Sequence, residues 1–136
     1  MMSKLDKGGC ILIDKNTMKV ALVFREYRND ISFPKGHVED GESLIDCAIR
    51  ETEEEIKRKV KLLSEEEICY EEYSSFEGDV VVHYYLGFDD GKSDNDSEDV
   101  HDLIWCDIDK VSETLTREST INMFLSVKNK IINSIK

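Results

Sequence analysis

The amino-acid sequence predicts an α/β domain in which a mixed β-sheet is sandwiched between helices (α/β/α). Short apolar runs rich in β-branched residues alternate with helical segments along the chain, an order typical of this class. No internal repeat, low-complexity tract or linker rich in proline, glycine and serine interrupts the 136 residues. That length suits one compact domain, so we expect a single domain over residues 1–136.

The strands are expected in seven short runs, each bounded by turn-forming residues. They are Gly8–Ile13, Lys19–Phe24, Ile31–Phe33, Val60–Leu63, Ile68–Tyr73, Val80–Phe88 and Leu103–Ile108. A turn at Asp14–Thr17 joins the first two, and a hairpin around Gly78 joins the fifth and sixth. The acidic segment Asp89–Asp99 is expected to be a solvated connection.

Helices are expected at 43–57, 109–115 and 119–135. The first follows a loop over Lys35–Glu42 that begins after Pro34, the only proline. Ser43 is a good N-cap, and Asp46 places a carboxylate in the first turn. The start of this helix is therefore well specified by the sequence.

Charge and composition exclude several classes of function. The formal net charge is −12, from 30 acidic and 18 basic residues, so the chain should repel nucleic acid and anionic lipid. We therefore expect neither a DNA-coating role nor a membrane-surface role. An anionic chain also repels a phosphorylated substrate unless divalent cations lie between the two.

The cellular setting is expected to be the cytoplasm. No run of eighteen apolar residues occurs, and Met1–Lys7 lacks the apolar stretch of a secretory signal. The four cysteines form no CxxC pair, which argues against zinc and disulfides and favours small core residues in a reducing compartment. The sequence does not distinguish a monomer from a homodimer.

The first helix concentrates acidic residues on one stripe. At 3.6 residues per turn, Glu51, Glu54 and Glu55 adjoin the apolar stripe that should pack on the sheet, while Glu53 points to solvent. Like charges at this spacing destabilise a helix by a few tenths of a kcal/mol per pair. Hard oxygen ligands at this density suit Mg²⁺ or Mn²⁺. An ordinary solvated acidic face remains the alternative on this pattern alone.

The preceding loop supplies a fixed pattern around that stripe. The spacing G-x5-E-x7-R-E-U-x-E-E, where U is aliphatic, is met by Gly36, Glu42, Arg50, Glu51, Glu54 and Glu55. This pattern resembles the box of the Nudix (MutT-type) hydrolase family, and so implies the Nudix fold. The family box ends in glycine and an aliphatic residue, where this chain has Lys57 and Arg58. The departure puts the end of the helix in doubt more than the chemistry.

The run Pro34–His37, which opens the box, is similar to that of the diadenosine tetraphosphate hydrolase subfamily. The resemblance implies that Glu51, Glu54 and Glu55 bind the catalytic cations, joined by the main-chain carbonyl of Lys35. Gly36, Arg50 and Glu42 would then have structural roles in the box, with Arg50 and Glu42 orienting the loop. Lys35 and His37 would face the phosphate chain; a purely structural role for His37 remains open.

The implied reaction is attack of a metal-activated water on phosphorus, with Mg²⁺ or Mn²⁺ as cofactor. Glu54 is the first choice for the general base, within a catalytic set that includes Glu51. Asp99 lies where the subfamily has a distal glutamate, six residues before Trp105, and is the other candidate. Asp99 as an ordinary loop acid is the alternative.

For the base-binding end, the resemblance implies that Tyr84 stacks on an adenine. The second aromatic residue of the subfamily is replaced by Arg117, which would stack, contact a phosphate or lie in solvent. The expected substrate is a small nucleotide, first a dinucleoside polyphosphate such as diadenosine tetraphosphate. Ordinary or oxidised nucleoside triphosphates, nucleotide sugars and RNA 5′ ends are alternatives, and a non-catalytic nucleotide-binding module is a second class.

Overall fold

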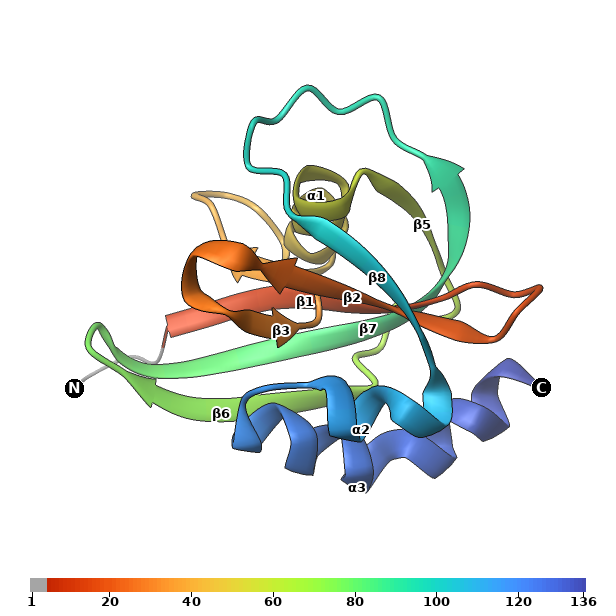
Figure 1. The fold of residues 1–136 in the computed structure, drawn as a ribbon. Coiled ribbons are helices and arrows are strands. Elements are labelled where there is room, and N and C mark those ends of the chain that lie inside the picture. The colour runs from red at the N-terminus through yellow and green to blue at the C-terminus, as the bar shows by residue number, and fades with distance from the viewer. Residues whose placement is uncertain (1–4) are drawn as a thin grey trace.

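A mixed β-sheet with helices on both faces forms the domain (Figure 1). The computed structural model describes residues 5–136. The strands are β1 (Leu5–Ile13), β2 (Lys19–Arg25), β3 (Asp30–Ser32), β4 (Lys35–His37), β5 (Arg58–Leu62), β6 (Cys69–Ser75), β7 (Gly78–Lys92) and β8 (Asp102–Asp107). The helices are η1 (Glu26–Arg28), α1 (Leu44–Ile56), η2 (Ile108–Lys110), α2 (Val111–Thr114) and α3 (Glu118–Ile135). This arrangement confirms the predicted α/β/α class.

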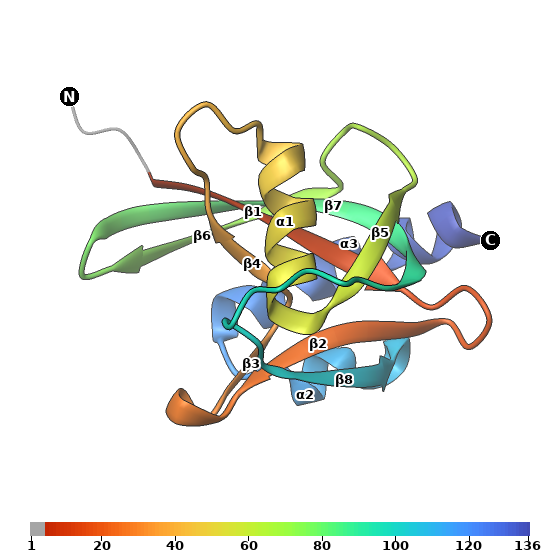
Figure 2. The ribbon, with the colours of Figure 1, turned by 90° about the horizontal axis from the view of Figure 1, so that it is seen from above.

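The sheet is centred on one parallel pair of strands. Its main path runs β3-β2-β1-β7-β5; β4 also pairs with β1, β6 with β7 and β8 with β2. Strands β1 and β7 are parallel over Leu5–Ile13 and Val80–Phe88, and the other pairings are antiparallel. In the view from above, α1 crosses the centre of the sheet, and the 93–101 connection passes beside the end of that helix (Figure 2).

Helix α1 packs directly on β1 because Gly8 leaves room for it. A Cβ on Gly8 would lie 2.7 Å from the carbonyl oxygen of Leu44 and 2.9 Å from the amide nitrogen of Ala48. On this face Ala48 packs with Cys10 and Tyr85 in a small apolar cluster. The close approach fixes the position of the helix that carries the acidic stripe.

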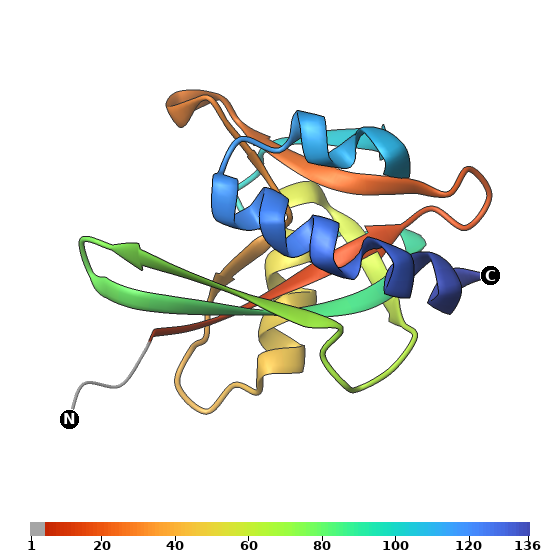
Figure 3. The same cartoon turned by 90° about the horizontal axis from the view of Figure 1, so that it is seen from below.

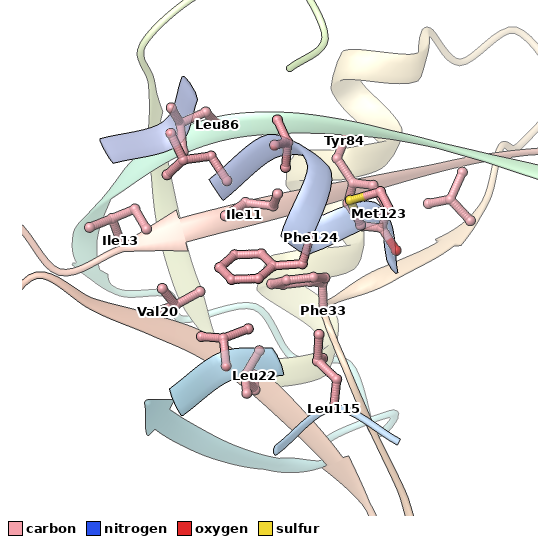
Figure 4. Close-up of a cluster of buried hydrophobic side chains, with 14 of the residues drawn as sticks. Ile11, Ile13, Val20, Leu22, Phe33, Tyr84, Leu86, Leu115, Met123 and Phe124 are labelled. Carbon is pink, nitrogen blue, oxygen red and sulfur yellow. The ribbon is translucent and has the colours of Figure 1, made fainter. Parts of the chain in front are cut away.

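The larger core lies on the opposite face, beneath α3 (Figure 3). Phe124 of α3 meets Phe33 with ring centroids 5.9 Å apart, and Phe33 meets Tyr84 edge-on at 5.5 Å (Figure 4). Ile11, Leu22 and other strand residues complete this core. Burial of these side chains supplies the main driving force for packing α3 on the sheet, at roughly 25 cal/mol per Å² of apolar surface.

A buried carboxylate ties α3 to the sheet at the start of the helix. Glu71 of β6 accepts hydrogen bonds from the hydroxyls of Ser119 (2.6 Å), Thr120 (2.8 Å) and Tyr84 (3.0 Å). Leaving this acid without partners would cost several kcal/mol. The three donors therefore fix how α3, and the residue before it, Arg117, lie against β6.

A histidine joins β7 to two acidic residues on the surface. His83 contacts Glu67 at 2.9 Å through Nδ1 and Asp6 at 3.1 Å through Nε2. Burial alone would lower the pKa of His83, but the hydrogen bonds to Glu67 and Asp6 outweigh it. The pKa of His83 therefore lies above its ordinary value of 6.5.

Several element boundaries differ from the sequence prediction. Residues 35–37, expected in a loop, form β4, because Gly36 pairs with Gly8 of β1. Strand β7 runs on to Lys92, into the segment expected to be a solvated connection, because β5 pairs with it as far as Arg58↔Lys92. Helix α1 ends one residue before the predicted boundary, at Ile56. Of the expected single domain over 1–136, residues 1–4 lie outside the described part.

Most of the cysteines lie in the core. All four cysteines are free, and Cys10, Cys47 and Cys106 are buried. Within residues 5–136, each helix is too short or too polar to cross a lipid bilayer.

Candidate active site

Helix α1 begins and ends at well-defined caps. The Ser43 hydroxyl accepts a hydrogen bond from the Asp46 amide at 3.0 Å, as the sequence predicts. At the other end Lys57 adopts the left-handed conformation, with φ 56° and ψ 42°, and its amide donates to Glu53. Lysine therefore takes the backbone conformation that glycine usually supplies at a helix end. The departure from the box leaves the end of the helix unchanged.

Arg50 holds the loop and the acidic stripe together. Its guanidinium donates to both carboxylate oxygens of Glu42, at 2.7 and 3.0 Å, and to the carbonyl oxygen of His37 at 2.9 Å. The same side chain reaches both oxygens of Glu54, at 2.8 and 2.9 Å, and one of Glu51 at 3.2 Å. The hydrogen bonds from Arg50 to Glu42 hold the pKa of the Glu42 carboxyl below its usual value. Arg50 thus offsets the repulsion among the acids of the stripe.

Glu51 lies directly against the loop glycine. A Cβ on Gly36 would overlap the Glu51 carboxylate, so any other residue here would displace that carboxylate from the loop. Burial, and to a smaller degree the neighbouring charge of Glu55, raises the pKa of Glu51 to about 7. A nearby cation would counter that shift and favour the ionised form.

Glu55 is the most buried acid of the stripe, with 3% of its surface exposed. One oxygen contacts Nη2 of Arg25 at 2.5 Å, and the other accepts from the Lys35 amide at 2.9 Å. Arg25 also donates to the hydroxyl of Ser32. Glu55 is therefore fixed by groups from β2 and β4, and its orientation is set before any ligand binds.

The connection between β7 and β8 brings a second pair of ligand-type residues to Glu55. The amide of His101 donates to the carbonyl of Glu55 at 2.8 Å, and Nε2 of His101 lies 3.2 Å from the Asp99 carboxylate. One ligand atom from each of these three residues lies within 4.8 Å of the others. The sequence analysis missed His101; its position two residues after the candidate base Asp99 was the available signal.

Lys57 anchors this connection to the end of α1. Its Nζ donates to the carbonyl oxygens of Asn95 and Ser97, at 2.7 Å each. The Ser93 hydroxyl bonds to Glu53, which is half-buried rather than pointing to solvent as the helical wheel predicted. Helix α1 thus holds both the acidic stripe and the loop that carries Asp99.

Several of the residues described above line one cavity of about 230 Å³, which we call the central cavity. It is lined by Lys7, Arg25, Tyr27, Arg28, Lys35, Gly36, His37, Glu51, Glu55, Asp99 and His101. Three carboxylates and two imidazoles in one cavity are a suitable donor set for a divalent cation. Glu54, the third expected ligand, lies outside this lining and is bound by Arg50 in this structure.

Lys35 and His37 both face the central cavity. Burial lowers the pKa of the Lys35 ammonium, whose Nζ lies 5.9 Å from the centre of the Tyr73 ring. His37 is exposed and also lines a neighbouring cavity of about 660 Å³. That second cavity, which we call the Arg117 cavity, lies between the β6–β7 hairpin and the start of α3.

The expectation that Tyr84 stacks on a base is wrong in this structure. Its ring is fully buried between Phe33 and the rest of the core, and its hydroxyl donates to Glu71. The alternation of side chains along a strand placed it on the core face. Arg117 instead stacks on Tyr73, with its guanidinium carbon 4.2 Å from the ring centre.

An acidic helix stripe, a loop glycine and nearby cationic side chains surround one cavity, an arrangement that suits a divalent cation and a phosphorylated ligand. Residues 6–125 match the family described as NUDIX domain. The chain therefore belongs to the Nudix family, and it is a pyrophosphohydrolase acting on phosphoanhydrides. Enzymes of this family generally use a divalent metal.

Several solved structures share the fold. A NUDIX hydrolase from Nitrosomonas europaea is similar, with TM-score 0.75, 17% identity, and coverage of 94% of this chain and 90% of that one. The C. elegans Ap4A hydrolase in a binary complex gives TM-score 0.73 and 20% identity, covering 93% and 98%. The E. coli dihydroneopterin triphosphate pyrophosphohydrolase gives 0.67 and 14%, covering 97% and 99%. No curated protein matches the chain. At these identities the likeness shows the fold alone.

Proposed function

We propose that the protein hydrolyses a dinucleoside polyphosphate such as diadenosine tetraphosphate, with Mg²⁺ or Mn²⁺ as cofactor. The observation that carries the proposal is that acidic and cationic side chains line the central cavity together. Glu51, Glu55 and Asp99 line it together with the cationic side chains of Lys7, Arg28 and Lys35. The acids suit a divalent cation, and the cations suit a long phosphate chain in a protein of net charge −12.

A divalent ion held by Glu51 and Glu55, with the Lys35 carbonyl as a further oxygen ligand, would activate water and neutralise charge on the phosphates. Glu54 lies on the same helix stripe, one turn from Glu51, and serves as a ligand once Arg50 releases it. The ammonium of Lys35, supported by His37, orients the phosphate chain. Asp99 and Glu54 remain the two candidates for the general base.

The contacts favour Asp99 as the base. Both oxygens of Glu54 are occupied by Arg50, whereas the Asp99 carboxylate is largely exposed and faces the central cavity. His101 lies 3.2 Å from Asp99 and orients its carboxylate. A base must be able to reach the proton that it takes, and the exposed Asp99 carboxylate is more accessible than that of Glu54. If Asp99 is the base, Asp99→Asn lowers kcat strongly with little change in metal affinity; if Glu54 is, Glu54→Gln gives the larger loss.

The Arg117 cavity is suited to bind a nucleobase at one end of the substrate. Tyr73, Phe76 and Arg117 line it, and it shares Lys7, Arg28 and His37 with the central cavity. A base stacked on these groups would therefore lie next to the phosphate chain. Base–aromatic stacking contributes roughly 1–3 kcal/mol per base by alanine substitution. This assignment replaces Tyr84 with Tyr73 as the aromatic partner of Arg117.

Turnover on a nucleotide panel tests the proposal. Dinucleoside polyphosphates, ordinary and oxidised nucleoside triphosphates, nucleotide sugars and 5′-triphosphorylated RNA are compared with Mg²⁺ present, and the products are separated by chromatography. We expect the highest kcat/KM for a dinucleoside polyphosphate and no activity in excess chelator. A clear preference for a single-base substrate overturns the assignment, and full activity in chelator overturns the metal role.

A non-catalytic nucleotide-binding module is the second class of function. The retained acids Glu51, Glu54 and Glu55 argue against it, since a pure binder does not need all three. Glu51→Gln separates the two classes, because it should lower turnover by two or more orders of magnitude while nucleotide binding persists. Binding without turnover by the wild-type protein on every substrate of the panel would favour the module.

A further inference from the structure

A third cavity adjoins the central cavity, and Arg117 is not among its lining residues. It has a volume of about 460 Å³, and we call it the Tyr27 cavity. Its lining residues are Phe24, Glu26, Tyr27, Val100, His101 and Asp102. Tyr27 and His101 also line the central cavity, so the two cavities share part of their walls. The central cavity therefore shares lining residues with two larger cavities, Tyr27 and His101 with this one and Lys7, Arg28 and His37 with the Arg117 cavity.

Tyr27 presents a largely exposed aromatic surface that is not part of the buried core. It lies in η1, the short turn between β2 and β3, which buries no residue, and 72% of its surface is exposed. Val100 beside it is 49% exposed. Apolar side chains that are exposed next to each other in a hollow mark a binding surface more often than isolated ones do. The exposed Tyr27 ring leaves apolar surface in contact with water, which is unfavourable, and it does not stabilise the core by burial.

The other groups around Tyr27 are those that stack on a flat ring. The His101 ring centroid lies 6.0 Å from that of Tyr27, tilted by 34°, and the guanidinium of Arg28 lies 5.2 Å from the Tyr27 ring centre. Arg28 also lines the central and Arg117 cavities, where it can reach a phosphate. One side chain thus links the aromatic surface to the path of the phosphate chain.

The charge of the Tyr27 cavity selects the chemistry of its occupant. Glu26 and Asp102 line it, and lysine and arginine do not occur in its lining. Carboxylates repel a phosphate but accept hydrogen bonds from amino groups. A flat, uncharged aromatic group that carries N–H donors fits this cavity, and a nucleobase is such a group.

We propose that the Tyr27 cavity is a second nucleobase subsite, which takes the base at the far end of a dinucleoside polyphosphate. The inference rests on the proposed function and deepens it. The phosphate chain lies across the central cavity, one base stacks by Tyr73 and Arg117, and the other stacks on Tyr27. The site therefore prefers substrates with a base at each end of the phosphate chain over those with one.

The test compares a two-base and a one-base substrate of equal phosphate number. Diadenosine tetraphosphate and adenosine 5′-tetraphosphate are assayed with wild type, Tyr27→Ala, Tyr27→Phe and Tyr70→Ala. Tyr70 is the matched control, because it is another exposed tyrosine and lies outside the linings of the three cavities described here. Loss of stacking worth roughly 1–3 kcal/mol corresponds to a change of about 5- to 150-fold.

We expect Tyr27→Ala to raise the KM for diadenosine tetraphosphate at least five-fold more than the KM for adenosine 5′-tetraphosphate. Tyr27→Phe should restore the wild-type ratio of the two KM values, because the ring is kept. An equal change for both substrates, or a Tyr27→Ala ratio equal to that of Tyr70→Ala, overturns the second subsite.

Calorimetric binding of a methylene-bridged, non-hydrolysable analogue of diadenosine tetraphosphate separates this inference from the proposed function. Suppose that wild type binds the analogue at least five-fold more tightly than Tyr27→Ala does but cleaves no dinucleoside polyphosphate. The proposed hydrolysis then fails and the subsite stands. If wild type cleaves the substrate while both proteins bind the analogue equally, the subsite fails and the hydrolysis stands. If both measurements fail, both assignments are wrong.

Discussion

Replacing Lys57 by glycine restores the usual box residue, and we expect this change to weaken the protein. Two structural effects oppose each other. Glycine relieves the left-handed conformation of Lys57, worth about 1–2 kcal/mol for a residue with a side chain. The variant also loses the two bonds from Nζ to the carbonyls of Asn95 and Ser97. Hydrogen bonds from a charged donor contribute about 1.5–3 kcal/mol each, and the lower figure suits a half-buried ammonium.

Two bonds at the lower figure total about 3 kcal/mol, so the net loss in Lys57→Gly is about 1–2 kcal/mol. For a domain of this size that loss lowers Tm by roughly 4–8 °C. The freed connection also carries Asp99 and His101, so kcat should fall about tenfold, which corresponds to about 1.4 kcal/mol in the barrier.

Differential scanning calorimetry and steady-state kinetics measure the two effects. Lys59→Met is the matched control, because Lys59 is exposed and lies two residues further on. This substitution removes the same charge as Lys57→Gly. We expect Lys59→Met to change neither Tm by more than about 2 °C nor kcat by more than about twofold. A Tm that rises in Lys57→Gly would refute the reasoning, since backbone strain would then outweigh the anchoring of the connection.

Three further changes test other parts of the structure. Gly36→Ala should lower turnover, because a Cβ would displace the Glu51 carboxylate from its place beside the loop; wild-type kcat in this variant would contradict that geometry. Glu55→Gln should destabilise the fold by about 1–3 kcal/mol, below the 3–5 typical of a broken buried ion pair because the amide oxygen still accepts from Arg25; unchanged denaturant midpoints would argue against the pair. The pKa of His83 is raised, so its contribution to the free energy of unfolding is complete below pH 6.5 and is lost as the pH rises through its folded-state pKa. The urea midpoints of wild type and His83→Gln should therefore converge on going from about pH 6 to pH 9. A constant difference between the two midpoints would exclude the linkage.

The loss of stability expected for Glu55→Gln is opposite to what helical spacing alone implies for the acidic stripe. On the wheel, Glu54 and Glu55 repel Glu51, so neutralising either one would leave stability unchanged or raise it. In the folded protein Arg50 and Arg25 compensate these acids. Removal of one carboxylate therefore leaves an arginine with fewer partners.

The local pattern of the sequence determined much of the site. Helical spacing placed the acidic stripe, Ser43 set the helix start, and the matched box supplied the family. These features depend on residues within one or two helical turns, where spacing fixes geometry. The α/β/α class followed from the order of strands and helices for a similar reason.

Only the tertiary structure decided which residues from distant segments meet. Tyr84 and Tyr73 are both strand aromatics in the sequence, but strand register places Tyr84 in the core and Tyr73 beside Arg117. Arg25 and His101 reach Glu55 through contacts across 30 and 46 residues of chain, which no local periodicity encodes. Sequence alone thus determined the helix that carries the acidic stripe, because its order is local. The folded sheet determined the partners of that helix and the two cavities beside it, because long-range pairing sets which strand ends come together.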